Sequence, residues 1–153
     1  MNLASTQFTL KNKNYEIYLA GCSAKPHCED CHNPELWDFN VGTPIDDTTY
    51  KLIDEKVKSF DKLIDSISLM GGEPLDQDIE ELKELLEHLK SLNKTLWLFT
   101  RYDLDEVPKD VLMYFDYVKC GRYYPDKKSN HTEYGVTLAT SNQHIYKRGK
   151  DYT

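Results

Sequence analysis

Short apolar segments alternate along this chain with segments whose apolar residues recur at helical spacing. The segments with strand character are residues 15–19, 64–70, 95–100 and 116–119. The segments with helical periodicity are residues 48–60, 78–92 and 108–114. Strand–helix–strand order is typical of βαβ units, in which helices cover a sheet of parallel strands. The pattern therefore predicts an α/β fold.

The chain length limits how many such units can form. At 153 residues the chain fits a single domain, residues 1–153. A complete eight-unit barrel needs about 250 residues. We therefore predict a partial, open (βα) barrel of about five to six parallel strands, with a small open α/β sheet as the alternative. One more strand is expected at residues 135–139, after a polar loop at 121–132.

Composition and charge narrow the classes of partner. The chain carries 19 Lys and Arg against 26 Asp and Glu, which gives a net charge of −7. Nucleic acids and anionic membranes both need a basic face, so neither is an expected partner. No apolar run approaches the roughly 20 residues that span a bilayer. Residues 1–7 lack the basic start and apolar stretch of a signal peptide. We therefore expect a cytoplasmic protein.

Three of the four cysteines, Cys22, Cys28 and Cys31, lie within ten residues in the loop after the first predicted strand. Disulfides are rare in cytoplasmic proteins, so this cluster indicates a metal or redox site. Thiolates favour iron–sulfur clusters or zinc. Three thiolates on a four-iron cluster leave one iron open to a substrate, whereas a structural zinc site is closed by a fourth protein ligand.

Spacing alone leaves both of these metals open. The candidates for the fourth ligand of a zinc site are His27, His32 and Cys120.

A second motif follows the second predicted strand, where the chain reads Gly71-Gly72-Glu73-Pro74, and Thr100 ends the third strand. Glycines let backbone amides approach a substrate carboxylate closely, and Glu73 can pair with an ammonium group. An ordinary turn between strand and helix is the alternative. Because the carboxyl ends of parallel strands share one edge of a sheet, we expect these residues and the cysteine loop to meet in one cleft.

The sequence Cys-x-x-Cys-His-Asn-x-x-x-Trp-Asp at 28–38, followed by Gly-Gly-Glu-Pro at 71–74, resembles the radical S-adenosylmethionine activases of glycyl radical enzymes. The resemblance extends through 96–100 and 116–122 and ends near 141–143, so it covers most of the chain. The small size is similar to the branch of this family that activates anaerobic (class III) ribonucleotide reductase.

The resemblance implies that Cys22, Cys28 and Cys31 hold a catalytic [4Fe–4S] cluster whose open iron chelates S-adenosylmethionine. Reductive cleavage would give methionine and a 5′-deoxyadenosyl radical, which takes a hydrogen from a glycine of the large subunit of the reductase. The residues expected to bind this cofactor are Asn33, Gly71, Gly72, Glu73, Pro74 and Thr100. Further expected partners are a reduced flavodoxin or ferredoxin as electron donor, and a second copy of the chain in a homodimer.

The chain departs from the family pattern in three places. Five residues, rather than the usual three, separate Cys22 from Cys28. Asp30 precedes the last cysteine, and Arg101 stands where the subfamily commonly has Gly, as a surface residue or a partner contact. Two alternative functions therefore stay open: activation of another glycyl radical enzyme, and a zinc-binding interaction module without catalysis.

Overall fold

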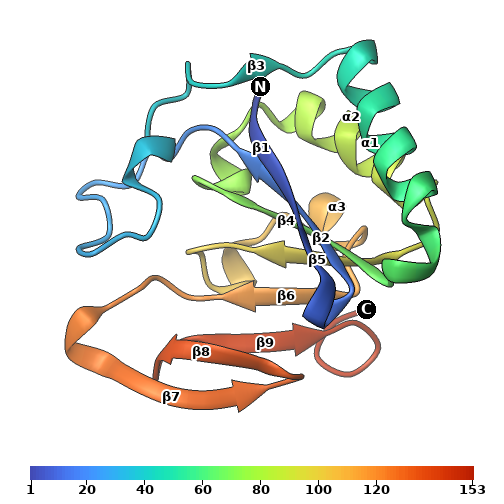
Figure 1. Cartoon of the computed structure of the whole chain (residues 1–153). Coiled ribbons are helices and arrows are strands. Elements are labelled where there is room, and N and C mark those ends of the chain that lie inside the picture. The colour runs from blue at the N-terminus through green and yellow to red at the C-terminus, as the bar shows by residue number, and fades with distance from the viewer.

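The computed structural model describes residues 1–153 as a seven-stranded mixed sheet with a separate two-stranded hairpin (Figure 1). The strand order in the large sheet is β3-β1-β2-β4-β5-β6-β9. Its strands are β1 (Asn2–Thr9), β2 (Asn14–Leu19), β3 (Thr43–Pro44), β4 (Ser66–Gly71), β5 (Thr95–Phe99), β6 (Tyr117–Cys120) and β9 (His144–Lys147). The hairpin consists of β7 (Lys128–Glu133) and β8 (Val136–Thr140).

Three α-helices connect the successive parallel strands: α1 (Asp47–Ser59), α2 (Ile79–Lys90) and α3 (Lys109–Leu112). The side chain of Asp46 caps α1 by accepting from the Thr49 amide, and Asp78 caps α2 by accepting from two amides of its first turn. Short 3-10 helices span Leu10–Asn12, Pro34–Leu36, Asp61–Leu63, Pro74–Asp76, Leu104–Glu106 and Pro125–Lys127. None of the helices has the length and apolar character needed to cross a membrane.

The core lies between the helices and one face of the sheet. Figure 1 shows α1 and α2 side by side over this face, and the rings of Tyr50 in α1 and His88 in α2 lie 4.6 Å apart. The helical periodicity predicted for residues 78–92 is confirmed in α2, where Leu82, Leu85 and Leu89 are fully buried in one stripe. Full burial of each such side chain stabilises the fold by about 1.5–3 kcal/mol.

The opposite face of the sheet carries no helix and presents both polar and aromatic side chains. Asn14 in β2 accepts hydrogen bonds from the hydroxyls of Ser66 and Ser68 in β4. The tip of the β7–β8 hairpin lies over this face, and the ring of its Tyr134 lies 5.3 Å from that of Tyr117 in β6. The hairpin therefore occupies a position where a complete barrel would have further strands.

The predicted partial (βα) barrel of five to six parallel strands is wrong. Only β2, β4, β5 and β6 run parallel to one another, while β1, β3 and β9 are antiparallel to their neighbours. The chain start folds back on β2 through a tight turn, in which Lys13 has a φ of 51°. β1 therefore occupies one edge of the four parallel strands, and β9 occupies the other. With both edges paired to antiparallel strands, the parallel sheet cannot continue as a barrel.

Two predictions for the C-terminal part also need correction. The strand expected at 135–139 exists as β8, but it pairs with β7 and not with the large sheet. Residues 128–132, expected in a polar loop, belong to β7. The polar sequence Lys-Ser-Asn-His-Thr-Glu hides this strand because neither of its faces is apolar.

Candidate metal centre

A cavity of about 350 Å³ lies at the carboxyl ends of the four parallel strands. Eight of the nine residues predicted from the sequence line it, and only Pro74 does not. Pro74 is buried where it begins a 3-10 helix. The lining residues from the prediction are Cys22, Cys28, Cys31, Asn33, Gly71, Gly72, Glu73 and Thr100. The structure thus brings together segments from the ends of β2, β4 and β5.

Backbone hydrogen bonds join the start of the cysteine loop to residues 36 and 37, which follow its last cysteine. The amide of Gly21 donates to Leu36 at 2.8 Å, and the amide of Cys22 donates to Trp37 at 3.1 Å. The imidazole of His27 stacks on Trp37 with 4.1 Å between ring centroids, and its Nε2 lies 2.8 Å from the Cys22 carbonyl oxygen. His27 therefore anchors the extra length between the first two cysteines.

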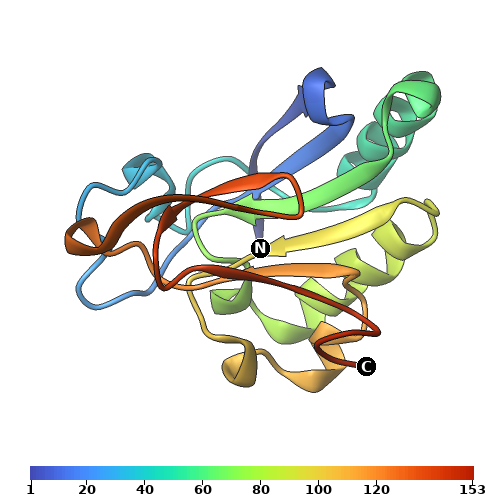
Figure 2. The same ribbon diagram turned by 90° about the horizontal axis from the view of Figure 1, so that it is seen from below.

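The connection after β6 forms the far wall of the cavity. Arg122 donates a hydrogen bond to the carbonyl oxygen of Pro26, and the ring of Tyr123 lies 6.1 Å from that of His32. Figure 2 shows the cysteine loop and this connection next to each other, at the end of the sheet away from α1. The cysteine loop thus contacts a segment about a hundred positions later in the sequence.

The three thiols line one cavity but are not as close together as the ligands of a single ion. Only two sets of three metal-ligating side chains have their ligand atoms within 4.8 Å of one another, and neither set contains a cysteine. A tetrahedral zinc site needs its ligand atoms within about 4 Å of one another. In a cubane cluster each thiolate binds a different iron, so the sulfurs lie further apart. Three partly exposed thiols around one cavity are therefore a suitable donor set for a [4Fe–4S] cluster.

Of the three candidate fourth ligands of a zinc site, only His32 lines the cavity with the cysteines. Cys120 is 2% exposed within the hydrophobic core, and burial raises the pKa of its thiol to about 12. Its sulfur is therefore protonated at neutral pH and is a poor metal ligand. His27 is occupied by its stack on Trp37, whereas His32 lies in the wall of the cavity.

Gly71, the last residue of β4, and Gly72, which follows it, stand where backbones pass closely. A Cβ on Gly72 would lie 2.4 Å from the carbonyl oxygen of Gly21, and Gly71 has a φ of 128°. The amide of Gly72 donates to Leu19, and the amide of Glu73 donates to Gly21. The glycines therefore dock the start of the cysteine loop onto β4, and these two amides are already paired within the chain.

Glu73 is the most deeply buried ionisable group at the cavity, at 1% exposure. Its Oε1 accepts from the Thr100 hydroxyl at 2.7 Å and from the Leu75 amide at 3.0 Å, while its Oε2 accepts from the Arg101 amide at 2.8 Å. Burial raises the pKa of Glu73 to about 7, although these hydrogen bonds oppose the rise. Glu73 thus joins the end of β4 to the end of β5.

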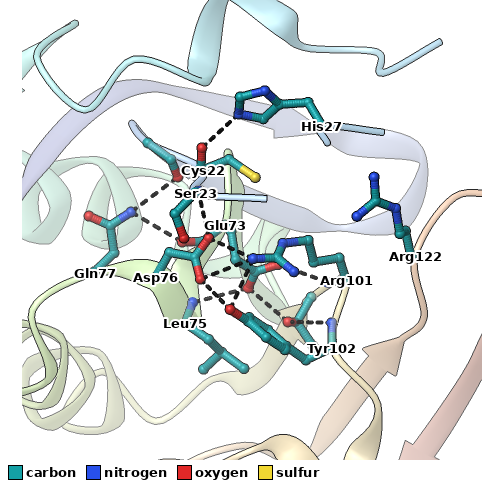
Figure 3. A network of polar contacts seen from close by, with 12 residues as sticks. Cys22, Ser23, His27, Glu73, Leu75, Asp76, Gln77, Arg101, Tyr102 and Arg122 are labelled. Atoms are coloured by element: carbon teal, nitrogen blue, oxygen red, sulfur yellow. Dashed lines mark hydrogen bonds and ion pairs between the residues drawn. The ribbon is translucent and has the colours of Figure 1, made fainter. Parts of the chain in front are cut away.

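Sequence analysis missed a buried ion pair beside Glu73. The Arg101 guanidinium donates to both oxygens of Asp76, at 3.0 and 3.3 Å, and the side chains are only 20% and 4% exposed (Figure 3). Asp76 also accepts from the Ser23 amide at 2.8 Å, next to Cys22. Burial alone would raise the pKa of Asp76, but the hydrogen bonds that it accepts outweigh burial and lower the pKa below its ordinary value.

Arg101 also affects the pKa of the first cysteine, Cys22. Burial raises the pKa of the Cys22 thiol, while the Ala24 amide and the nearby Arg101 guanidinium oppose that rise. Arg101 was expected at the surface or at a partner, yet it lines the cavity. The only signal in the sequence is a lone cation directly after the third predicted strand, where the parallel topology places it near the cysteine loop.

Three cysteines in one loop at the carboxyl ends of the parallel strands are typical of an iron–sulfur protein. The model of the 4Fe-4S single cluster domain family matches residues 13–146, and the chain belongs to this family.

Its relatives specify the kind of protein further. This chain is 27% identical over 117 residues to an anaerobic ribonucleoside-triphosphate reductase-activating protein of Haemophilus influenzae. The alignment covers 72% of this chain and 74% of the relative. Relatives of the same name from Escherichia coli and Salmonella typhimurium are 27% and 28% identical, each covering 73% of this chain and 75% of the relative. These matches confirm the resemblance to the activating proteins of anaerobic ribonucleotide reductase. No solved structure matches the chain.

Proposed function

We propose that this protein is a radical S-adenosylmethionine activase of anaerobic ribonucleotide reductase. Cys22, Cys28 and Cys31 would hold a [4Fe–4S] cluster that, once reduced, supplies the electron for cleaving the sulfonium of S-adenosylmethionine into methionine and a 5′-deoxyadenosyl radical. The observation that carries the proposal is the lining of one cavity by these three cysteines with no fourth cysteine beside them. An iron without a protein ligand is where a substrate can bind.

The cavity suits a charged small molecule. Its volume of about 350 Å³ lies within the range of small-molecule sites, about 300–1,000 Å³. Arg101 and Lys119 both line it, so two cations face the position of a substrate carboxylate. Burial lowers the pKa of Lys119, which weakens its charge relative to that of Arg101. Arg101 is therefore the stronger candidate for the carboxylate of S-adenosylmethionine.

The Nε atom of Arg101 supports this assignment. It is buried and has no hydrogen-bond partner within the protein. An unpaired buried donor costs about 1–3 kcal/mol. A cluster-bound anion or the negative charge of the thiolates next to it would supply the missing acceptor.

Glu73 has a narrower role than the sequence implied. A carboxylate offers about four acceptor positions, and protein donors take three of them. We infer that Glu73 mainly positions Thr100 and Arg101, and keeps one acceptor position for the ammonium group of the substrate. Asn33, which lines the cavity, remains a proposed contact of the cofactor.

The partner follows from the relatives, which are named as activating proteins of anaerobic ribonucleoside-triphosphate reductase. We propose that this chain acts on the large subunit of such a reductase and places a radical on one of its glycines. A reduced flavodoxin or ferredoxin would supply the electron. The alternatives are another glycyl radical enzyme as the partner, or zinc binding without catalysis.

The test uses anaerobically purified, cluster-loaded protein, a low-potential reductant, S-adenosylmethionine and the reductase from the same source. We expect a glycyl radical doublet in the EPR spectrum of the reductase. Cys28→Ala should abolish it, and Cys120→Ala is the matched control because Cys120 lies in the core away from the cavity.

Each outcome has one interpretation. A full doublet from Cys28→Ala would refute the cluster assignment. Cleavage of S-adenosylmethionine without a doublet would point to another partner.

A further inference from the structure

A second group of metal-ligating side chains lies between the hairpin and the edge of the large sheet. His131 and Glu133 project from one side of β7, and His144 begins β9. The Glu133 Oε2 atom lies 3.1 Å from the Nε2 of His131 and 3.1 Å from the Nδ1 of His144. All three ligand atoms lie within 4.8 Å of one another.

These separations match those around one small cation. Zinc binds histidine nitrogen and carboxylate oxygen at about 2.0–2.2 Å, which places neighbouring ligand atoms of a tetrahedral site about 3.3 Å apart. Two imidazoles and one carboxylate are a known zinc ligand set that leaves a fourth position for water. A surface hollow of about 540 Å³ adjoins Glu133 and His144, so solvent reaches this side of the group.

Two of the three ligands are already oriented through their remaining polar atom. The Nδ1 of His131 lies 2.9 Å from the hydroxyl of Ser129, which leaves Nε2 to face Glu133. The Oε1 of Glu133 accepts from the Ile145 amide at 3.0 Å, which turns Oε2 toward the histidines. Metal-binding histidines and carboxylates typically have such partners on the atom that does not bind the metal.

The Nε2 of His131 faces two oxygen atoms, so hydrogen bonding satisfies it in only one of the two neutral tautomers. Its Nε2 lies 3.1 Å from both the Gln143 carbonyl oxygen and Glu133 Oε2, so one N–H faces two acceptors. If the proton is instead on Nδ1 and donates to Ser129, the Nε2 lone pair faces two oxygens. A cation among these atoms removes that conflict.

We propose that His131, Glu133 and His144 form a binding site for a divalent cation of the zinc class, separate from the cysteine loop. An ion there would join the β7–β8 hairpin to β9. The His144 end of β9 pairs with β6, whose last residue, Cys120, lies opposite His144. The hairpin would thereby be fixed over the helix-free face of the sheet. Gly121, which follows β6, lines the cavity.

The experiment measures zinc binding to the cluster-loaded full chain by equilibrium dialysis, with iron content determined in the same samples. We expect one zinc per chain in the wild type. Affinity should fall by at least about tenfold in His144→Ala and in Glu133→Gln, which lose a ligand.

His88→Ala is the matched control. The Nε2 of His88 lies 2.6 Å from Asp54 Oδ1, so it is also a histidine–carboxylate pair, but it has no third ligand. Zinc should also slow amide hydrogen exchange in β8 of the wild type and of His88→Ala, but not of His144→Ala. Equal zinc binding by His144→Ala and wild type, or no zinc binding by the wild type, would overturn the proposal. Neither result bears on the cysteine loop.

Discussion

Replacing Glu73 with glutamine removes a buried carboxyl group whose ionisation opposes folding. Burial raises the pKa of Glu73 from its ordinary 4.5 to about 7 in the folded chain. A carboxyl with a raised pKa holds its proton more tightly in the folded state than in the unfolded state. Its contribution to stability is therefore largest below pH 4.5 and is lost as the pH rises to about 7.

The size of the effect follows from that pKa difference. Each pKa unit corresponds to about 1.4 kcal/mol, so the free energy of unfolding of the wild type should lose about 3 kcal/mol over this pH range. Glutamine has the same shape but does not titrate. Its amide nitrogen will face one of the N–H or O–H donors around Glu73, which adds a cost that does not vary with pH.

The assay is urea denaturation of wild type and Glu73→Gln, both without cluster and under reducing conditions, from pH 4.5 to 8. We expect the free energy of unfolding of the variant, relative to wild type, to rise by about 3 kcal/mol between pH 4.5 and 7 and then to level off. Glu55→Gln, at an exposed position of α1, should run parallel to wild type. Parallel curves for Glu73→Gln would refute the reasoning about its burial.

Three further substitutions probe the site. Arg101→Met leaves Asp76 buried without its cation, so unfolding free energy should fall by about 3 kcal/mol in urea titrations. The same change should make the cluster harder to reduce in spectroelectrochemistry, and an unchanged potential would contradict the placement of Arg101. Gly72→Ala puts a methyl group 2.4 Å from the Gly21 carbonyl oxygen, so iron content should drop. Gly135→Ala meets open space, and its φ of 79° strains only the turn between β7 and β8, so this variant should keep its iron. His27→Ala removes the stack on Trp37 and should speed iron loss to a chelator; wild-type loss rates would rule out that anchoring role.

The helices and the parallel strands were predictable because the spacing of their apolar residues follows the side of each element that is buried. The leucine stripe of α2 and two leucines of β5, Leu96 and Leu98, face the core. Both elements were located within one or two residues. Because the strands are parallel, their order along the chain also indicated that the cysteine loop and Gly71–Glu73 would share one edge.

Apart from β8, the antiparallel strands were not predictable from periodicity. Strands β1 and β7 consist mostly of polar residues, and their pairing depends on turns and on distant partners. The local sequence also concealed Arg101 and Asp76, because their pairing depends on two strand ends that lie 25 positions apart. Glu73 was located correctly, but only the structure showed that Thr100, Leu75 and Arg101 already donate to it.

The iron and sulfide content of anaerobically purified protein, read together with the EPR spectrum of the reduced sample, tests the cluster assignment most directly. We predict about four iron and four sulfide per chain, and a spectrum that changes when S-adenosylmethionine is added. A preparation without iron and sulfide would contradict a cluster held by Cys22, Cys28 and Cys31. A reduced cluster whose spectrum does not change when S-adenosylmethionine is added would contradict an iron without a protein ligand.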